Sequence, residues 1–473
     1  MSKEIDRLIA KSALTESSSH HDTTEVLSWL KEKGLEFQNN TQKTSLASLR
    51  DWEYPKNNSI LQHKSGKFFQ IFGIRVHTNF GEVESWTQPI IDQPEIGILG
   101  IIAREINGIL HFLMQAKMEP GNLNGVQLSP TLQATRSNYT RAHGGKYPNY
   151  LEYFLGKRNR YVTLVDQLQS EHGSKFLHKR NRNTVILVEE NIQQHDDYRW
   201  LTLGQIKKLC NEDNLVNMDT RTVIAGLSFV SERHTKAEGG DYSLGSTITN
   251  QFKRDLFWSA IDGLETAYSN REIVSWFTEL KCKYEMKVQR ISLSELELWN
   301  VEDDMIEHCE SKYFRIIGVD VKLSGREIEQ WSQPLIESLG VGLCALIIKK
   351  VNGVYHFLIQ GKVECGNLDA LELAPTVQCT MQGMTGTNPP KYLDFIQNAD
   401  VSQIRFDSHL SEEGGRFFQY QNRYIIVEVE ETTEIPQSNN FIWMSFQQIL
   451  TLLQSSGVIN IHTRSLIACL SFT

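Results

Sequence analysis

The residues of this sequence best suited to chemistry are Lys117 and Glu119, in the stretch Gln-Ala-Lys-Met-Glu-Pro-Gly-Asn-Leu at 115–123. A lysine can neutralise a phosphate as a point charge, and a glutamate can act as a base or bind hydroxyl groups. Alternate residues of a β-strand share a face, so both side chains would project into one space. A surface ion pair at a strand end would fit one copy of the pattern equally well.

The same stretch returns 245 residues later, at 360–368, as Gln-Gly-Lys-Val-Glu-Cys-Gly-Asn-Leu. Four further motifs recur with this spacing: Trp-x-Gln-Pro from Trp86 and Trp331, Asn-Gly from 107 and 352, His-Phe-Leu from 111 and 356, and Pro-Thr-x-Gln from 130 and 375. Internal repeats drift freely where nothing constrains them, so the retained residues favour a binding or catalytic loop. The chain is therefore predicted to be a tandem duplication of one module of roughly 200 residues.

The elements that must position these loops can be read from hydrophobic periodicity. Two apolar runs within 96–119 are joined by Asn-Gly, which tolerates the positive φ of a type I′ turn, so a β-hairpin is expected there and again at 344–362. Apolar residues at helical spacing predict helices at 24–33 and 203–209, with counterparts in the second copy. Further strands are expected at 67–78, 184–189, 312–321 and 424–429. Strands flanked by helices predict α/β (α+β) modules, each with a mixed sheet.

A chain of 473 residues is too long for one hydrophobic core. The repeat divides it into a polar N-terminal tail at 1–23, a first module at 24–230, a linker with a connecting helix at 231–269, and a second module at 270–473. Each module is expected to build its own pocket. The apolar helix after the linker is expected to pack the modules together.

Composition limits the partners. A net charge of −9 and an isoelectric point near 5.9 argue against nucleic acid, although a locally basic pocket for a phosphorylated small molecule is compatible with them. No window approaches 18 uncharged apolar residues, and the N-terminus lacks the apolar core of a signal peptide, so no membrane association is expected. Seven scattered cysteines without a CxxC pair are typical of reduced thiols in the cytoplasm, and no coherent set of metal ligands is recognised.

The two copies differ most after the Pro-Thr-x-Gln motif. The first continues with Arg136, Tyr139, Arg141, His143 and Lys146, whereas the second has an uncharged stretch. Clustered cations with tyrosine, histidine and two glycines suit a phosphorylated ligand, and a flexible basic loop is the alternative. The difference predicts one working site in the first copy and one decayed site in the second.

Two further kinds of residue could bind a ligand or lie in the core. Trp86 and Gln88 could stack on and hydrogen-bond a base or sugar, with a buried tryptophan before a proline-fixed turn as the alternative. His111 and His356 lie within apolar strands and are interpreted as core histidines. No GxGxxG, Walker, GxSxG or HExxH motif supports a nicotinamide, ATP-hydrolysing, serine-hydrolase or zincin interpretation.

The duplicated loop, the Trp-x-Gln-Pro pairs and the run Gln-Ala-Thr-Arg-Ser-Asn-Tyr-Thr-Arg at 133–141 make the chain resemble the NDP-hexose 2,3-dehydratases of deoxysugar biosynthesis. The resemblance extends from about residue 24 to 472 and implies two tandem Nudix-like modules. Neither copy contains the Nudix hydrolase motif, a glycine followed by Arg-Glu and paired glutamates. The resemblance therefore implies the fold without pyrophosphate hydrolysis.

The resemblance also implies a reaction. Family members remove water across C2 and C3 of dTDP-4-keto-6-deoxyglucose, giving an enol that becomes a 3,4-diketo sugar. The 4-keto group acidifies the C3 proton, so the chemistry needs a base, a donor to the enolate oxygen and an acid for the C2 hydroxyl. It formally requires no cofactor. A homodimer is implied, as is a downstream 3-ketoreductase partner for the labile product.

Carried onto the first module, the resemblance implies Glu119 as the base beside Lys117, with Tyr139 or His143 as acid or base alternatives. The residues implied to bind substrate are Trp86, Gln88, Asn122, Gln127, Thr135, Arg136, Asn138 and Arg141, with the two arginines at the diphosphate. A weak or inactive second pocket is implied around Trp331, Gln333, Lys362, Glu364 and Asn367. A Nudix-type nucleotide-sugar hydrolase and a non-catalytic sugar-nucleotide binding protein stay as alternatives.

Overall fold

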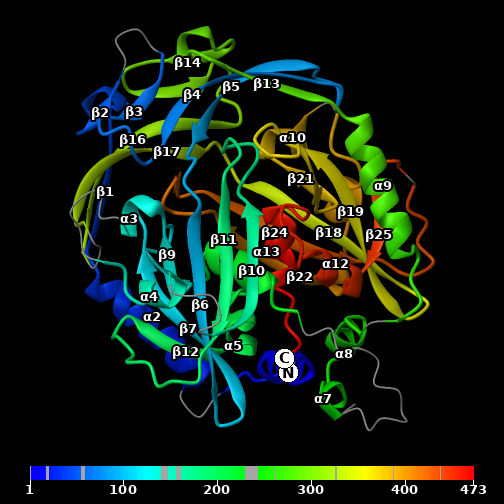
Figure 1. The fold of residues 1–473 in the computed structure, drawn as a ribbon. Helices are drawn as coiled ribbons and strands as arrows, with labels where there is room; N and C mark the ends of the chain where they lie inside the picture. Colours follow the sequence, from blue (N-terminus) through cyan, green and yellow to red (C-terminus); the bar gives the residue numbers. More distant parts are fainter. Residues whose placement is uncertain are drawn as a thin grey trace.

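The computed structural model describes residues 2–17, 21–54, 59–139, 147–155, 161–228, 243–261, 263–324, 328–386, 388–436 and 438–473. Over these residues the protein has a mixed α/β fold whose strands form four sheets. Figure 1 shows the two smaller sheets above the two larger ones, with the chain termini close together at the bottom of the view. Within the described ranges, no helix is long and apolar enough to cross a membrane.

Each larger sheet has seven strands and belongs to one half of the chain, the first half ending at residue 228 and the second beginning at residue 270. The first sheet consists of β10 (Val162–Ser170), β11 (Arg180–Leu187), β6 (Gly97–Ile106), β7 (Ile109–Met118), β12 (Tyr198–Thr202), β8 (Val126–Ser129) and β9 (Leu132–Ala134). The second consists of β22 (Ile404–Ser411), β24 (Gln421–Glu428), β18 (Gly342–Val351), β19 (Val354–Val363), β25 (Phe441–Ser445), β20 (Leu371–Ala374) and β21 (Val377–Cys379). The pairs β11–β6 and β24–β18 are parallel and their neighbours antiparallel, which confirms the predicted mixed sheets.

The predicted hairpins are confirmed as β6–β7 and β18–β19. Asn107 and Gly108 have φ values of 53° and 74°, and Asn352 and Gly353 have values of 51° and 80°. These are the left-handed values that a type I′ turn requires. Because the turn sets the register from its own local chemistry, it determines which face of each strand carries the residues that follow at its far end.

The two smaller sheets combine strands from both halves, which differs from the expected self-contained modules. One consists of β13 (Met286–Ile291), β4 (Gln70–Thr78), β3 (Leu61–His63), β2 (Trp52–Glu53) and β5 (Ser85–Asp92). The other consists of β1 (Asn39–Thr44), β16 (Phe314–Leu323), β15 (Met305–His308), β14 (Trp299–Val301), β17 (Gln330–Ser338) and β23 (Phe417–Phe418). β13 of the second half pairs with β4 along its whole length, and β1 of the first half does so with β16. Neither small sheet is complete without the other half.

The helices begin at recognisable caps. α2 (Thr23–Glu36) follows Asp22, which forms a capping box with Glu25, and α9 (Asn270–Lys283) follows Ser269 in the same way. The other helices are α3 (Arg136–Tyr139), α4 (Leu151–Leu155), α5 (Leu203–Leu209), α6 (Met218–Ala225), α7 (Ser243–Ser246), α8 (Gln251–Trp258), α10 (Met381–Thr385), α11 (Leu393–Gln397), α12 (Phe446–Leu452) and α13 (Ile461–Ala468). The connecting helix expected after the linker is α8, which packs on β19.

The N-terminal residues form a helix rather than the expected polar tail. In α1 (Ser2–Ala13), Ile9, Ala10 and Ala13 are buried, and Ser12 Oγ donates a hydrogen bond of 2.6 Å to the Leu110 carbonyl of β7. Apolar residues three and four positions apart are enough to give a helix one buried face, although the segment is polar on average.

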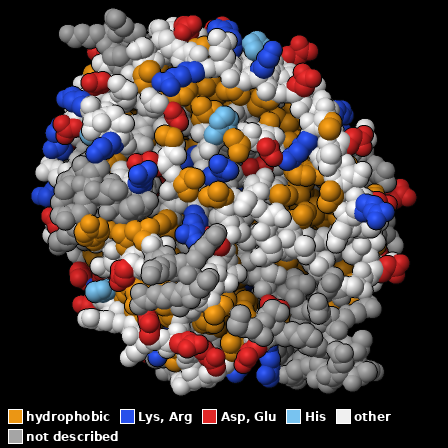
Figure 2. Space-filling model, in the orientation of Figure 1, with side chains coloured by type: hydrophobic (Ala, Val, Ile, Leu, Met, Phe, Trp, Pro, Cys, Tyr) orange, Lys and Arg blue, Asp and Glu red, His pale blue; other side chains and the backbone are white. Residues whose placement is uncertain are grey.

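Side chains of both charges are distributed over the surface. Figure 2 shows lysine and arginine side chains interspersed with aspartate and glutamate on one face of the molecule. On that face, the described residues therefore present no single-sign patch of the kind that attracts a polyanion.

Two loops cross from one half to the other, and we call residues 172–178 the first crossing loop and residues 413–419 the second. Backbone hydrogen bonds join them to the repeated motifs: from Gly121 to Gly414 and from Gln419 to Gly121 at 2.8 Å each, and from Gly366 to Gly173 and from His178 to Gly366 at 2.6 Å each. The glycine of each repeated motif is thus held by the crossing loop of the opposite half.

The close contact between Gly121 and the second crossing loop predicts that a larger side chain at residue 121 destabilises the protein. A methyl group on Gly121 would lie 1.6 Å from the Phe417 carbonyl oxygen, so Gly121→Ala must push the two halves apart. We expect it to lower the free energy of unfolding by about 1–3 kcal/mol or more, measured by urea denaturation. Gly34→Ala in α2 is the matched control, because a methyl group there meets no atom within 4 Å. Equal stability of the two variants would contradict the close approach.

Candidate active site

A cavity of about 440 Å³ opens at the repeated loop of the first half, and we call it the first pocket. Both halves line it, the first with Arg50, Trp52, Lys117, Glu119, Gln133, Glu171, Lys179 and Asp219, and the second with Trp331, Gln333, Glu413 and Arg416. Its size falls within the range of about 300–1,000 Å³ usual for small-molecule sites. The mixture of acidic, basic and aromatic side chains suits a charged, polar ligand.

Lys117 and Glu119 lie together at the end of β7, as the alternation of a strand predicts. Lys117 Nζ is 3.7 Å from Glu119 Oε1, and the two side chains are only 10% and 4% exposed. This burial distinguishes the pair from the solvent-exposed ion pair that was the alternative, because charges interact more strongly where water is excluded.

The Glu119 carboxylate is oriented by a neighbouring amide. Gln133 of β9 donates from Nε2 to Glu119 Oε1 at 3.0 Å, and Asn217 donates in turn to Gln133 Oε1 at 3.4 Å. The other oxygen, Glu119 Oε2, is buried. One oxygen is therefore fixed by the protein, and the other has no hydrogen-bond partner among the described residues.

Three more carboxyl groups line the same pocket: Glu171 before the first crossing loop, Asp219 in α6 and Glu413 in the second crossing loop. Burial and the charge of Glu119 raise the pKa of Glu413 to about 7. Burial and the charge of Glu413 raise the pKa of Asp219 well above its ordinary value. Because these groups repel one another when ionised, a proton is held among them near neutral pH.

Lys179 and Arg416 bring further positive charge to the pocket. Burial lowers the pKa of Lys179 to about 8, and its Nζ donates to the Glu95 carbonyl. The Arg416 guanidinium lies 4.3 Å from the centroid of the Phe69 ring and donates from Nε to Gln93 Oε1 at 3.2 Å. Both side chains are suited to holding an anionic part of a ligand.

The Trp-x-Gln motifs are exchanged between the halves. Trp331 and Gln333, expected in a second pocket, line the first pocket instead. Trp331 Nε1 donates to Gln333 Oε1 at 2.8 Å, and Gln333 Nε2 donates to the Gly415 carbonyl at 2.7 Å. The second crossing loop and the motif from the small sheet therefore enter the first pocket together.

Trp86 and Gln88, expected in the first pocket, lie beside the repeated loop of the second half. Cys365 Sγ is 3.8 Å from Gln88 Oε1, and Gln88 Nε2 donates to the Ser174 carbonyl at 2.9 Å. From sequence, each Trp-x-Gln motif was assigned to the pocket of its own half. The 245-residue spacing of the repeat could not show otherwise, because it is the same whichever pocket the motif lines. The exchange between the small sheets reverses that assignment.

Asn122 and Gln127 join the halves rather than line the cavity. Gln127 is fully buried and donates from Nε2 to Ser411 Oγ at 2.9 Å. Asn122 packs against the second crossing loop, where a methyl group on Gly414 would meet its Oδ1 at 2.1 Å. Their position corrects the expectation that both contact the sugar.

The remaining expected residues lie on or near α3. Thr135 lines the first pocket, with its Oγ1 2.9 Å from Ser137 Oγ, whereas the Arg136 side chain is exposed. The side chains of Asn138 and Tyr139 are not described, and Arg141 and His143 lie outside the described residues.

The lining residues that the sequence did not single out include Glu171, Lys179, Asp219, Glu413 and Arg416. A signal for three of them was present. Ser-Glu-His-Gly at 170–173 returns as Ser-Glu-Glu-Gly at 411–414, and Met-Asp-Thr-Arg at 218–221 returns as Ile-His-Thr-Arg at 461–464. The Thr-Arg pair of the second repeat belongs to the recognised duplication, but the neighbouring Asp219 was not singled out, and the first repeat, 241 residues apart, was not recognised.

The equivalent residues of the second half, for which we keep the name second pocket, retain the glutamine–glutamate contact of the first pocket. Gln378 Nε2 donates to Glu364 Oε1 at 2.9 Å, and Lys362 lies two residues before Glu364 on β19. Asn367 packs against the first crossing loop as Asn122 does against the second, because a methyl group on Gly173 would meet Asn367 Oδ1 at 2.1 Å.

The remainder of the second pocket is different, because His172 and His462 take the places of Glu413 and Asp219. His172 Nε2 and Glu412 Oε2 are 2.7 Å apart. Burial alone would raise the pKa of Glu412, but the charge and hydrogen bond of His172 lower it to about 2. Burial lowers the pKa of His462 to about 3. An ion pair and a neutral imidazole thus replace carboxyl groups that share a proton.

The first pocket therefore contains the kinds of group that acid–base chemistry requires. An oriented carboxylate with one unused oxygen lies beside carboxyl groups whose mutual repulsion retains a proton, so the site can both take and give one.

Comparison with known proteins agrees with this chemistry and narrows it. The family model described as NDP-hexose 2,3-dehydratase matches residues 23–227 and again 270–470, so the chain belongs to this family of enzymes. A relative from Saccharopolyspora spinosa is 44% identical over 467 residues, covering 98% of this chain and 94% of its own length. Relatives from Amycolatopsis orientalis and Streptomyces violaceoruber are each 38% identical, covering 98% and 95% of this chain and 93% and 97% of their own lengths. All three are named dTDP-4-dehydro-6-deoxy-alpha-D-glucopyranose 2,3-dehydratase.

The pKa of Glu413 makes stability depend on pH. Its folded-state pKa of about 7 exceeds the ordinary value of 4.5, so the folded protein keeps a proton that the unfolded chain loses. The protonated Glu413 carboxyl group therefore contributes fully to the stability of the folded state below pH 4.5, and this contribution is lost as the pH rises through 7. Because Glu413→Gln cannot ionise, we expect the variant to gain roughly 1–3 kcal/mol over the parent protein between about pH 5 and pH 8.

Urea denaturation at the two pH values measures this difference. Glu32→Gln, on the exposed face of α2, is the control and should follow the parent protein. A Glu413→Gln variant whose stability relative to the parent is the same at both pH values would show that Glu413 ionises normally.

Proposed function

We propose that this chain removes water across C2 and C3 of dTDP-4-keto-6-deoxyglucose, and that the reaction takes place in the first pocket. Family membership and the names of the relatives support the substrate and the reaction. The observation that carries the assignment to this pocket is that an oriented carboxylate, proton-holding carboxyl groups and several cations line one cavity.

Glu119 is the proposed base. Its free Oε2 takes the C3 proton, and the electrons of that C–H bond form an enolate with the C4 carbonyl. Collapse of the enolate restores the carbonyl, forms a C2=C3 double bond and expels the C2 hydroxyl, which takes up a proton and leaves as water. The resulting enol takes a proton at C2 and loses one from the C3 hydroxyl, leaving ketones at C3 and C4.

Lys117 is the proposed donor to the enolate oxygen. Its Nζ lies 3.7 Å from Glu119 Oε1, so the base and the cation can reach two neighbouring atoms of one sugar ring. A cation placed where negative charge develops stabilises the transition state more than the ground state. Gln133, which holds Glu119, is a positioning residue in this arrangement.

Glu413 and Asp219 are the proposed source of the proton for the departing hydroxyl. The raised pKa values of both groups support this role, because a general acid works best when it is still protonated near the working pH. Glu413 belongs to the second half, so the reaction proposed for the first pocket needs both copies of the repeat.

The lining residues that have no proposed role at the sugar are proposed to bind the nucleotide end of the substrate. Lys179 and Arg416 are proposed to hold the diphosphate, and Trp331 to stack on the thymine. Arg136, Asn138, Tyr139, Arg141 and His143 stay proposals as further ligand or acid–base groups, because α3 begins next to Thr135 at the pocket wall.

We further propose that the enzyme is a hydro-lyase that acts in the cytoplasm as a homodimer of Nudix-like modules. The seven cysteines, which are all free thiols, support a reducing compartment. A 3-ketoreductase is proposed to consume the product, because adjacent ketones make it labile. The second pocket, where histidines replace the two proton-holding carboxyl groups, is proposed to bind nucleotide sugar weakly or not at all.

The two repeated glutamates provide a matched test of where the chemistry occurs. We expect Glu119→Gln to lower kcat by about 100-fold or more, because an amide cannot take the C3 proton. Glu364→Gln makes the same change in the second pocket and should keep most of the activity. Initial rates with dTDP-4-keto-6-deoxyglucose measure both. An inactive Glu364→Gln beside an unimpaired Glu119→Gln would move the reaction to the second pocket.

The function itself is tested with the same substrate in deuterated water, with a 3-ketoreductase as trap. We expect a 2-deoxy sugar that carries deuterium at C2, because the enol takes its new hydrogen from solvent. Mass spectrometry and NMR detect the label. Recovery of unchanged sugar despite tight binding would favour a binding protein, and release of thymidine monophosphate on adding Mg²⁺ would favour a hydrolase.

A further inference from the structure

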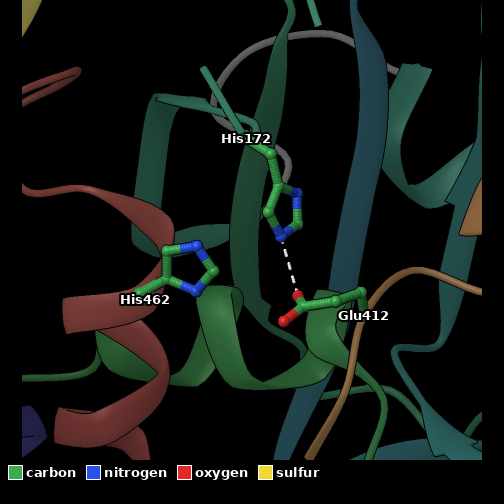
Figure 3. A group of neighbouring side chains, drawn as sticks. All are labelled: His172, Glu412 and His462. Atoms are coloured by element: carbon green, nitrogen blue, oxygen red, sulfur yellow. Dashed lines mark hydrogen bonds and ion pairs between the residues drawn. The ribbon is translucent and has the colours of Figure 1, made fainter. Parts of the chain in front are cut away.

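The second pocket contains a group of side chains that the proposed reaction does not use. His172 of the first crossing loop, Glu412 after β22 and His462 of α13 are buried and converge (Figure 3). Each offers one nitrogen or oxygen atom, and these three atoms lie within 4.8 Å of one another. Across the described residues, no other set of three His, Cys, Asp or Glu side chains meets this condition.

We propose that this cluster binds a divalent transition-metal ion of the Zn²⁺ class, with His172 Nε2, Glu412 Oε2 and His462 Nε2 as the protein ligands. Two imidazoles and one carboxylate form a ligand set that suits Zn²⁺, and the same set accepts Co²⁺ as a spectroscopic substitute. Mg²⁺ and Ca²⁺ prefer all-oxygen sites, so the two imidazoles disfavour them.

The surrounding hydrogen bonds select these ligand atoms. Asn422 Nδ2 donates to Glu412 Oε1, while Glu412 Oε2 faces His172 Nε2 at 2.7 Å. The Tyr424 hydroxyl lies 2.8 Å from His462 Nδ1 and 3.2 Å from Glu412 Oε1. With Nδ1 of His462 engaged by the tyrosine, Nε2 is the nitrogen left for an ion. Outer contacts of this kind orient ligands in metal sites.

The third ligand is also oriented toward the cluster. His172 Nδ1 is buried without a hydrogen-bond partner among the described residues, so the polar interactions of this ring lie on its Nε2 side. Ligands about 2.0–2.2 Å from a tetrahedral Zn²⁺ lie roughly 3.3 Å from one another. Binding therefore requires His172 and Glu412 to separate slightly and His462 to move closer, which side-chain rotations can supply.

The ion would connect the two halves. His172 comes from the first half, whereas Glu412 and His462 come from the second half. Such a site acts as a clamp, because the free energy of binding adds to the stability of the folded state. The first pocket has Glu413, Glu171 and Asp219 in the equivalent places, so the clamp would be specific to the second pocket.

Metal titration of the full-length protein tests the proposal without an activity measurement. After treatment with a chelator and dialysis, we expect one Co²⁺ per chain by absorption spectroscopy, its displacement by Zn²⁺, and a higher Tm with Zn²⁺ than without. His172→Gln and His462→Gln should each weaken binding by at least about 100-fold, since each removes a ligand. His77→Gln, an exposed histidine on β4, is the control and should bind as the parent protein does.

Tyr424→Phe keeps all three ligands and removes only the hydroxyl that contacts His462. This variant tests the proposed metal site if the histidine variants fail to fold. We expect it to weaken binding by roughly 10–100-fold. The proposal is overturned if the parent protein takes up no Co²⁺ or Zn²⁺, or if stoichiometric uptake survives unchanged in the folded variants of the cluster.

Discussion

The burial of two guanidinium groups between the halves of the chain is the constraint on which the structure depends. Arg221 of α6 and Arg464 of α13 are 0% and 1% exposed. Arg221 Nη2 donates to the Ser411 carbonyl at 2.7 Å, and Arg464 donates to the Ser170 carbonyl. Buried charges must be compensated, and each guanidinium here donates to one carbonyl of its own half, Val216 or Ile459, and to one of the opposite half. The halves therefore cannot separate without removing part of the hydrogen bonding of both cations.

These contacts place the crossing loops, because Ser170 and Ser411 stand just before them. The two residues that follow each serine serve different pockets: Glu171 and Glu412 contribute to the pocket of their own half, whereas His172 and Glu413 contribute to the pocket of the opposite half. Each pocket is thus built from both copies of the repeat. A substitution in the loop of one half changes the chemistry of the pocket in the other, which lets the two pockets diverge through very few residues.

Local features of the fold were predictable from sequence, but the exchange of strands and motifs between the two halves was not. The Asn107-Gly108 turn carries its own conformational signal, and the Lys117–Glu119 alternation follows from strand geometry, so the hairpin and the paired side chains were predicted. Trp331 was assigned to the wrong pocket, because a tandem repeat gives the same spacing whether its strands pair within a half or across halves. Glu413 was missed although it lies in a repeated motif, because the repeat does not show that its side chain reaches the pocket of the opposite half.

The difference between the pockets follows from the charges of two replaced residues. Glu413 and Asp219 lie near Glu119, and burial together with like charge raises their pKa values and keeps a proton in the first pocket. At the equivalent places, His172 pairs with Glu412 and lowers its pKa to about 2, while His462 stays neutral. Carboxyl groups buried close together keep a proton, because two neighbouring negative charges repel each other. A carboxyl group paired with a cation instead loses its proton to solvent. The retained Lys-x-Glu loop therefore has an acid beside it in one pocket and an ion pair in the other, although a glutamine donates to its glutamate in both.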